Sequence, residues 1–225
     1  IMYGGTDPSI ADSNAHEIYF PDETPMKCLC LWGTDPSYSC PGMGGGAVAE
    51  LRARGVKTVV IDPRMTPDAA KATVWLPIRP GTDVALQLCW VRYILEHKLY
   101  NAAFVMKWTN LPYLVNTQTG ECWRAAKSTQ KGVPDTFMVW DQKTNRPQPL
   151  PYPWDDALDP ALEGSWEWDG VVYKTGYQLL KERSAPYTLE ETARICWLMP
   201  EKIEEAIRTF CENTPSGLCI GVATD

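Results

Sequence analysis

The sequence contains no apolar run of the roughly 18 residues that a membrane-spanning helix needs, so nothing in it is expected to cross a bilayer. Positive charge is also scarce: 21 lysines and arginines stand against 28 aspartates and glutamates, for a net charge of −7. Nucleic acids and most membrane surfaces are polyanionic, so this balance argues against general binding to either. Any anionic ligand must therefore be held by a local set of donors.

Metal-ligand patterns are few as well. The two histidines, His16 and His97, are not spaced from a cysteine as in zinc sites, and no Cys-x-x-Cys pair occurs. His16 lies in a polar stretch and His97 at the end of an apolar helical pattern, so neither is expected to be catalytic. Most cysteines are expected to pack in the core of a protein from a reducing compartment. They are Cys28, Cys30, Cys40, Cys89, Cys122, Cys196, Cys211 and Cys219.

The length of 225 residues suffices for one large α/β domain or two small ones. The chain begins with Ile1 instead of methionine, and it stops shortly after an apolar stretch that is typical of a buried strand. We therefore expect a piece of a longer protein, in which a signal peptide, a metal-cluster segment or further domains would lie outside these residues.

The rest of the chain is arranged around the stretch 27–46. Residues 28–32 are apolar or carry sulfur, which predicts a buried strand that ends in a polar turn at Gly33. Serine hydroxyls and a run of glycines follow, and a helix is predicted to begin near Met43 with its positive end toward the same turn. Such a loop suits a phosphate group, although a connection that merely needs turn residues has the same composition.

A second strand and its loop come next. The helical spacing of 47–54 and the stop at Gly55 lead to the apolar run 57–61, a strand, helix, strand crossover that is typical of a parallel sheet. Asp62 and Arg64 directly follow this strand, at the edge where open parallel sheets bind ligands. An aspartate there suits ribose hydroxyls and an arginine suits phosphate. A strand-ending turn with a surface arginine is the alternative.

A third strand is predicted at 74–78, and it leads through Gly81 to a long apolar helix at 84–97. Thr82 or Asp83 is expected to cap that helix, which is by itself a sufficient reason for either residue. The loops after all three strands should meet at one edge of the sheet, because the carboxyl ends of parallel strands lie together.

The composition changes at residue 112, where turn signals begin to dominate. A hairpin is predicted at 165–174 with its turn at Asp169 and Gly170. Helical patterns return after residue 175, and a last strand at 216–222 would bring Gly221 to the ligand edge. The predicted fold is therefore α/β, with a Rossmann-like parallel sheet flanked by helices and an inserted excursion rich in β-hairpins. The predicted parts are an N-terminal segment 1–26, a dinucleotide-binding domain 27–111 and 175–225, and an insertion 112–174.

Three motifs together resemble a known family. They are Trp32-Gly-Thr-Asp-Pro-x-x-Ser39, Ile61-Asp-Pro-Arg-Met-Thr-Pro-x-Ala-Ala-Lys-Ala72 and Leu76-Pro-Ile-Arg-Pro-Gly-Thr-Asp-x-Ala-Leu86. As a set they look like the dinucleotide-binding domain of the molybdenum or tungsten enzymes that carry two molybdopterin guanine dinucleotides, the dimethyl sulfoxide reductase superfamily. The resemblance is strong over 27–110 and weaker toward the end of the chain.

The resemblance implies a cofactor-binding site. Thr34 and its neighbours would cradle the dinucleotide, Asp62 and Arg64 would meet the guanosine ribose and its surroundings, and Asp83 would accept hydrogen bonds from the guanine edge. Position 35 departs from the family, in which asparagine is usual, and an aspartate there adds repulsion near a pyrophosphate unless a donor or counter-ion intervenes. The full set of expected cofactor-binding residues is Trp32, Gly33, Thr34, Asp35, Ser39, Asp62, Arg64, Gly81, Asp83 and Gly221.

Residues 160–164, 177–183 and Tyr187 are similar to the branch that contains acetylene hydratase. The resemblance implies molybdenum or tungsten held by two dinucleotides and one protein ligand, with a [4Fe-4S] cluster in a preceding segment and with Ile1 and Met2 near the metal pocket. The reaction would be two-electron transfer of an oxygen atom or hydride, or a hydration. The fragment alone is not expected to be active.

The partners implied by the resemblance are the remaining domains of the same chain, a small-molecule substrate and an iron–sulfur electron-transfer subunit. No nucleic acid and no insertion into a membrane are expected. The cytoplasm is the expected location, or the periplasm if a twin-arginine signal precedes the fragment.

Two other functions stay open. The run from Gly42 to Ala47 matches G-x-G-x-x-A, the fingerprint of an NAD(P)-binding Rossmann dehydrogenase, but nine residues separate Trp32 from Gly42, whereas the first glycine normally follows its strand at once. A non-catalytic scaffold subunit with the same fold is the other alternative. The ten tryptophans are expected to pack in the core, because basic residues do not alternate with them as in a nucleic-acid platform.

Overall fold

The computed structural model describes residues 26–39, 41–126, 135–151 and 157–221. Contacts divide the chain into two compact units: Ile1–Leu99 with Pro186–Asp225 form unit 1, and Tyr100–Ala185 form unit 2. His16, Cys40 and the two residues expected near the metal pocket lie outside the described residues. The domain boundaries expected from composition, with an insertion at 112–174, stay a prediction.

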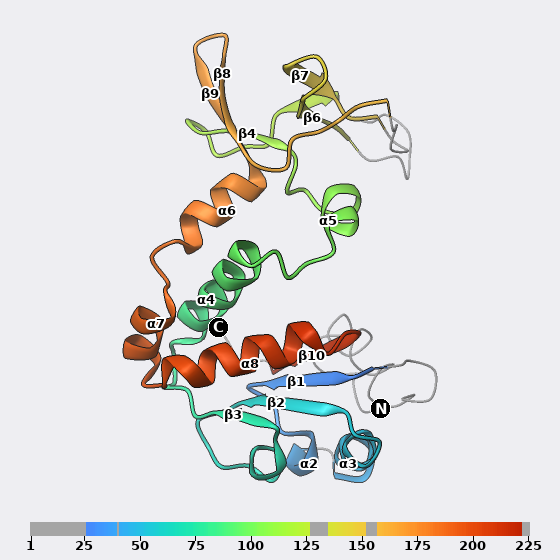
Figure 1. The fold of residues 1–225 in the computed structure, drawn as a ribbon, viewed down its shortest axis with the longest axis vertical. Coiled ribbons are helices and arrows are strands. Elements are labelled where there is room, and N and C mark those ends of the chain that lie inside the picture. The colour runs from blue at the N-terminus through green and yellow to red at the C-terminus, as the bar shows by residue number, and fades with distance from the viewer. Residues whose placement is uncertain (1–25, 40, 127–134, 152–156, 222–225) are drawn as a thin grey trace. The chain divides into compact units, whose positions relative to one another are not determined.

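Unit 1 is built on a four-stranded parallel sheet in the order β10-β1-β2-β3 (Figure 1). The strand β1 is paired on both sides, from Cys28 to Trp32, with the whole length of β10 and of β2. The predicted α/β fold is thereby confirmed, and β1 and β2 lie within the predicted ranges. The strands are β1 (Cys28–Trp32), β2 (Lys57–Ile61), β3 (Val74–Leu76) and β10 (Ser216–Ile220).

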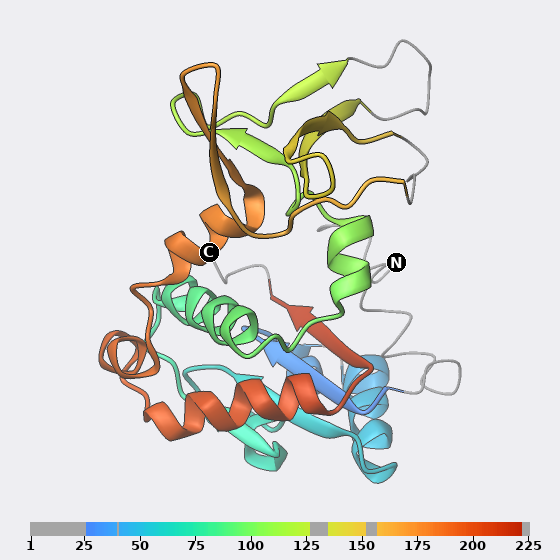
Figure 2. The same cartoon turned by 45° about the horizontal axis from the view of Figure 1, so that its top comes forward.

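Helices cover both faces of this sheet (Figure 2). On one face, α3 (Gly46–Ala53) packs its buried residues against alternate strand residues. On the other face lie α4 (Asp83–Glu96), α7 (Leu189–Cys196) and α8 (Pro200–Glu212). Because successive strand side chains point to opposite faces, strands covered on both sides must be apolar throughout. This explains why the predicted strands β1 and β2 have uninterrupted apolar runs.

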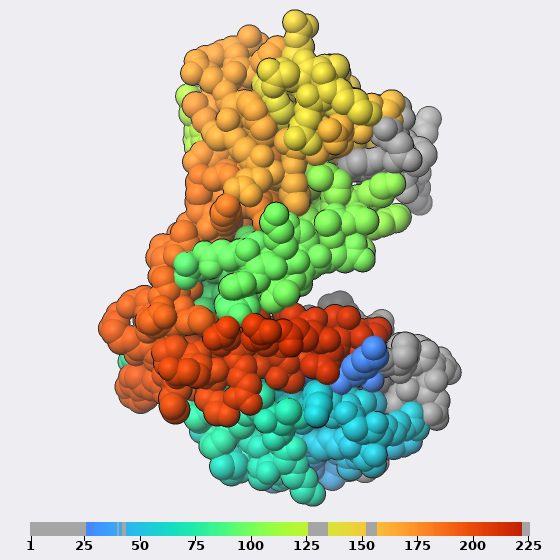
Figure 3. Space-filling model, viewed as in Figure 1, coloured from blue at the N-terminus to red at the C-terminus, as the bar shows by residue number. Residues whose placement is uncertain are grey.

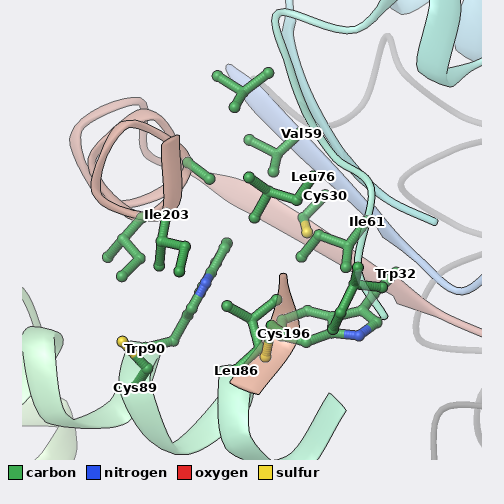
Figure 4. Packing of buried hydrophobic residues seen from close by; sticks show 14 of the residues in the cluster. Cys30, Trp32, Val59, Ile61, Leu76, Leu86, Cys89, Trp90, Cys196 and Ile203 are labelled. Carbon is green, nitrogen blue, oxygen red and sulfur yellow. The ribbon is translucent and has the colours of Figure 1, made fainter. Parts of the chain in front are cut away.

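The larger core cluster joins the sheet to α4, α7 and α8 (Figure 4). The rings of Trp32 in β1 and Trp90 in α4 meet edge to face, with centroids 5.5 Å apart. Cysteines contribute to this core as small apolar side chains, as predicted, and burial raises the pKa of the Cys28 thiol to about 12. Among the described cysteines none forms a disulfide. The described His97 ends α4 and stacks on the ring of Tyr93.

The described residues of unit 2 form two antiparallel sheets and two helices. Figure 3 shows its hairpins β6–β7 (yellow) and β8–β9 (orange) packed side by side, and the indole rings of Trp140 and Trp166 stack there at 4.7 Å. The predicted hairpin turn is confirmed, since Asp169 and Gly170 both have positive φ angles, 49° and 74°. The elements are α5 (Ala102–Trp108), β4 (Leu114–Asn116), β5 (Arg124–Ala126), β6 (Thr136–Asp141), β7 (Arg146–Pro149), β8 (Ser165–Trp168), β9 (Val171–Thr175) and α6 (Gly176–Ser184).

None of the helices in the described part of the chain is long and apolar enough to cross a membrane.

The end of β10 approaches the end of β1 unusually closely. The Gly221 N–H donates to the Trp32 carbonyl oxygen at 2.7 Å, and a Cβ atom on Gly221 would lie only 1.9 Å from the carbonyl oxygen of Gly33. No side chain fits there without a shift of the backbone. Glycine at this position is therefore required by the packing of two backbones.

We expect Gly221→Ala to lower the free energy of unfolding by about 1–3 kcal/mol, the usual cost of overpacking, in urea denaturation of the full chain. Gly46→Ala is the matched control, because a Cβ atom there meets nothing within 4 Å and alanine favours a helix. Equal stability of the Gly221→Ala chain and the wild type would show that β10 does not approach Gly33 this closely.

Candidate functional site: the carboxyl edge of the parallel sheet

The carboxyl ends of the parallel strands form one edge, and the register aligns them. Trp32, the last residue of β1, pairs with Ile220 of β10 and with Ile61 of β2. Beyond the strands, the Gly33 N–H still donates to the Ile61 carbonyl at 2.8 Å, and Gly221 donates to Trp32. The loops that carry the predicted site residues therefore start from the same edge of the sheet.

The loop after β1 is closed by its own polar groups. Gly33 has φ 63° and is exposed, and Asp35 precedes the one-turn helix α2 (Pro36–Ser39). Both the N–H and the hydroxyl of Ser39 donate to the Asp35 carbonyl, at 2.9 and 2.8 Å. The hydroxyl of Ser39, a predicted phosphate donor, is therefore engaged within the turn. The side chain of Thr34 makes no hydrogen bond with another described residue.

The glycine run has a packing role. A Cβ atom on Gly44 would lie 2.9 Å from Pro36 Cβ, and one on Gly45 would lie 2.9 Å from Ser37 Cα. Glycines therefore let the π-helical turn η1 (Pro41–Gly45) touch α2, and α3 begins after this turn instead of near Met43. Because α2 separates β1 from the glycines, the run does not have the chain geometry of a nicotinamide fingerprint.

A buried aspartate that the sequence analysis did not single out joins two of the loops. Asp68 is fully buried, and its carboxylate accepts from the Ser37 hydroxyl at 2.7 Å and from the Ser37 N–H at 3.1 Å. It also pairs with Arg52 of α3 at 3.0 Å. Burial alone would raise the pKa of Asp68, but the hydrogen bonds from Ser37 and Asp35 and the charge of Arg52 lower it. In the sequence, Asp68 is indistinguishable from a residue in the first turn of a helix.

The neighbouring Asp35 is buried without comparable support. Its Oδ1 atom is inaccessible and has no hydrogen-bond partner in the described part of the chain. Burial, followed by the hydrogen bond and the charge of Asp68, raises the pKa of Asp35 to about 6. The two carboxyl groups thus lie next to each other with opposite tendencies to ionise.

The loop after β2 presents a cation. The buried carboxylate of Asp62 accepts from the backbone N–H of Arg64 at 2.8 Å and lies 3.4 Å from its Nε. The Arg64 side chain is 73% exposed, so its guanidinium group contacts Asp62 through Nε and is otherwise largely accessible to solvent. Trp75 fixes the loop from below, since its Nε1 donates to the Asp62 carbonyl at 2.9 Å. The structure therefore joins two of the predicted site residues, Asp62 and Arg64.

Asp83 is joined to Trp32 in the same way. The Trp32 Nε1 donates to Asp83 Oδ1 at 2.8 Å, and both side chains are buried. Thr82 is the N-cap residue of α4, which confirms the prediction that Thr82 or Asp83 caps this helix, but its side chain makes no capping hydrogen bond. The Thr82 hydroxyl instead donates to the Arg79 carbonyl, and the Asp83 carboxylate accepts from the indole N–H. Only 3% of Trp32 is exposed, and its polar atom donates to Asp83; the expected contact of Trp32 with the cofactor stays a prediction. Gly81, with φ 77°, makes the exposed turn before this helix.

The donors and acceptors at this edge fit a dinucleotide. All the hydrogen bonds that other described residues give to the carboxylates of Asp62 and Asp83 go to Oδ1, so Oδ2 can accept from ribose hydroxyls or from base N–H groups. Arg64 supplies a positive charge for a phosphate. The described residues contain no cluster of three or more histidine, cysteine or acidic side chains that would hold a metal ion.

The parallel sheet with its ligand edge belongs to the class of α/β nucleotide-binding folds. No protein-family model matches the chain. It is 33% identical over 192 residues to the catalytic polypeptide of a putative dimethyl sulfoxide reductase from Halobacterium salinarum, a match that covers 85% of this chain and 23% of that protein. It is 31% identical over 180 residues to the alpha subunit of dimethylsulfide dehydrogenase from Rhodovulum sulfidophilum, covering 76% of this chain and 20% of that protein.

Among solved structures, acetylene hydratase from Pelobacter acetylenicus matches with a TM-score of 0.54 and 22% identity, over 88% of this chain and 18% of that chain. This match bears on the fold. The chain belongs to the dimethyl sulfoxide reductase family of molybdopterin enzymes, whose members use molybdenum or tungsten. It spans about a fifth to a quarter of the length of these relatives.

The hydrogen bond between Trp32 and Asp83 can be tested by removing the indole N–H. We expect Trp32→Phe to cost about 1–3 kcal/mol more stability than Trp90→Phe in urea denaturation of the full chain, because it leaves a buried carboxylate without its donor. Trp90 is the matched control: it lies in the same core, and its buried Nε1 has no partner among the described residues. Equal losses in the two variants would contradict the assigned bond.

Proposed function

We propose that this chain is the part of a molybdenum or tungsten enzyme that binds a molybdopterin guanine dinucleotide along the carboxyl edge of its parallel sheet. One observation carries the proposal: two buried carboxylates, Asp62 and Asp83, stand on adjacent loops with one oxygen each engaged, beside the exposed guanidinium group of Arg64. Asp62 would take the ribose hydroxyls, Asp83 the guanine amino and ring N–H groups, and Arg64 a phosphate.

Other predicted residues would offer donors to the dinucleotide or shape the loops that hold it. Gly33 and Thr34 would offer an N–H and a hydroxyl to the dinucleotide, and Gly81 would let the third loop turn beneath it. Asp35 and Ser39 shape the first loop, and Gly221 permits the close approach of β10. These roles bind and orient the dinucleotide, whereas the metal centre supplies the two-electron chemistry when it is bound.

The proposal extends to the whole protein as follows. A second dinucleotide, the protein ligand of the metal and a [4Fe-4S] cluster would be bound by parts of the enzyme outside this chain. Several relatives are named as one subunit of a reductase or a dehydrogenase, which supports a redox reaction on a small molecule and a partner subunit. We propose that this partner is an iron–sulfur electron-transfer subunit. Hydration is the second candidate, because acetylene hydratase shares the fold. We propose the cytoplasm as its location, or the periplasm if a twin-arginine signal precedes the chain.

The decisive experiment uses the full-length enzyme, purified without oxygen. We expect about one molybdenum or tungsten atom by elemental analysis and about two guanine nucleotides released on denaturation, the stoichiometry of two dinucleotides on one metal. Absence of both the metal and the guanine nucleotide would overturn the proposal and favour the nicotinamide-binding or scaffold alternatives.

Asp62→Asn and Asp83→Asn should each lower the guanine content of the folded enzyme several-fold, because the neutral amide presents one acceptor fewer and a donor in its place. Asp141→Asn is the matched control. Asp141 is equally buried, but it lies in unit 2 and binds Thr144 and Asp159. It should lose stability and keep its guanine. A similar guanine loss in all three variants would show that the effect is general destabilisation.

A further inference from the structure

Asp35 and Asp68 are two carboxyl groups buried together at the base of the loop that follows β1. Asp68 is fully buried, Asp35 is 9% exposed, and the two carboxyl groups lie close enough for each to shift the pKa of the other. A hydrogen bond between two carboxyl groups requires a proton on one of them, and two adjacent buried carboxylates repel each other strongly. Because the pKa of Asp35 is about 6, the pair holds this one proton below about pH 6.

The surrounding groups decide which carboxyl carries the proton. Asp68 accepts two hydrogen bonds from Ser37 and pairs with Arg52, which together stabilise its charge. Asp35 has weaker support: a backbone hydrogen bond from Tyr38 lowers its pKa, but its Oδ1 is buried without a partner in the described part of the chain. The charges that act on Asp35 are those of Asp68 and Asp62, both negative. The neutral acid is therefore Asp35, and Asp68 is the ion.

The same two residues hold the loop in place. The carbonyl of Asp35 accepts from the N–H groups of Tyr38 and Ser39, and Asp68 anchors Ser37 from the opposite side. Ionisation of Asp35 would set two like charges against each other under this loop. It would also add a negative charge to an edge that is to hold an anionic ligand, where Arg52 is already committed to Asp68.

We propose that Asp35 and Asp68 share one proton, and that this proton keeps loop 33–39 in the conformation that accepts the pyrophosphate part of the dinucleotide. Asp68 is then a positioning residue for the cofactor, and Asp35 makes retention of the cofactor depend on pH. The identity of the ligand as a dinucleotide rests on the proposed function, whereas the shared proton does not.

The proton itself can be observed by carbon-13 NMR of the aspartate carboxyl groups in the full chain. We expect one aspartate to titrate at a pKa of about 6 and its resonance to be lost in Asp35→Asn. In Asp68→Asn the pKa of Asp35 should fall toward the ordinary value of about 3.9. If Asp68→Asn does not fold, Ser37→Ala serves instead, because it removes one donor from Asp68 and should shift the same titration. An ordinary pKa for Asp35 in the wild type would overturn the proposal.

Stability gives an independent readout. The folded pKa of Asp35 lies above its unfolded value, so its stabilising contribution is complete below about pH 3.9 and is lost as the pH rises through about 6. Between about pH 3.9 and pH 6, the stability of Asp35→Asn relative to wild type should increase, by up to about a hundredfold in the unfolding equilibrium constant. Above this interval the difference between the two proteins should stay constant. Glu50→Gln, exposed on α3, is the control and should show no such gain.

Retention of the cofactor tests the second half of the proposal. The wild-type full-length enzyme should release more guanine nucleotide during dialysis at about pH 8 than at about pH 5.5, and Asp35→Asn should release equally little at both. Equal pH dependence in the two proteins would refute control by Asp35. Absence of guanine from the wild type at every pH would instead defeat the proposed function, and the NMR titration would still decide whether the proton is shared.

Discussion

The parallel pairing of β1 with β10 and β2 is the constraint on which the rest of unit 1 depends. Residues 28–32 pair with 57–61, close in sequence, and with 216–220, which lie beyond the whole of unit 2. The register places the ends of the strands side by side. A shift by one residue would turn the alternating side chains of β1 to the wrong faces and would separate Gly33 from Gly221.

The carboxylates at this edge depend on one another's loops for their donors. A buried charge without a partner costs several kcal/mol, so each buried acid must find a donor. Asp83 of α4 finds the indole of Trp32 in β1, and Asp68 finds Ser37 and Arg52. These pairs connect elements that are separate in sequence, and they hold the loops in one arrangement before any ligand arrives. Pre-organisation of this kind lowers the entropic cost of binding.

Fold and function rest on different observations in this protein. The likeness to acetylene hydratase shows a shared fold, and one fold supports several chemistries. The relatives in sequence define the family, and their names include reductases and dehydrogenases of sulfur and chlorine compounds. In the proposed function, the chain contributes a binding edge whose acidic and basic groups hold and orient a nucleotide. The choice of reaction would then belong to the metal centre and to the substrate pocket.

Local patterns were enough to locate most elements and the edge of the sheet at which the candidate site lies. The strands 28–32 and 57–61, the helix 84–97 to within a residue at each end and the turn at Asp169 follow from periodicity and turn chemistry, which act over a few neighbouring residues. Asp62 and Arg64 were predicted as site residues because the end of a parallel strand is a general place for a ligand.

Other features were decided only in three dimensions, because they join residues that are distant in the chain and no local pattern encodes such a contact. The tertiary structure alone shows that Asp68 links two loops, that the indole of Trp32 donates to Asp83, and that burial, followed by the neighbouring carboxyl groups, raises the pKa of Asp35. The glycines at 44, 45 and 221 likewise owe their necessity to backbones that approach from other elements. Sequence thus determined where the polar residues stand, and packing determined which of them meet.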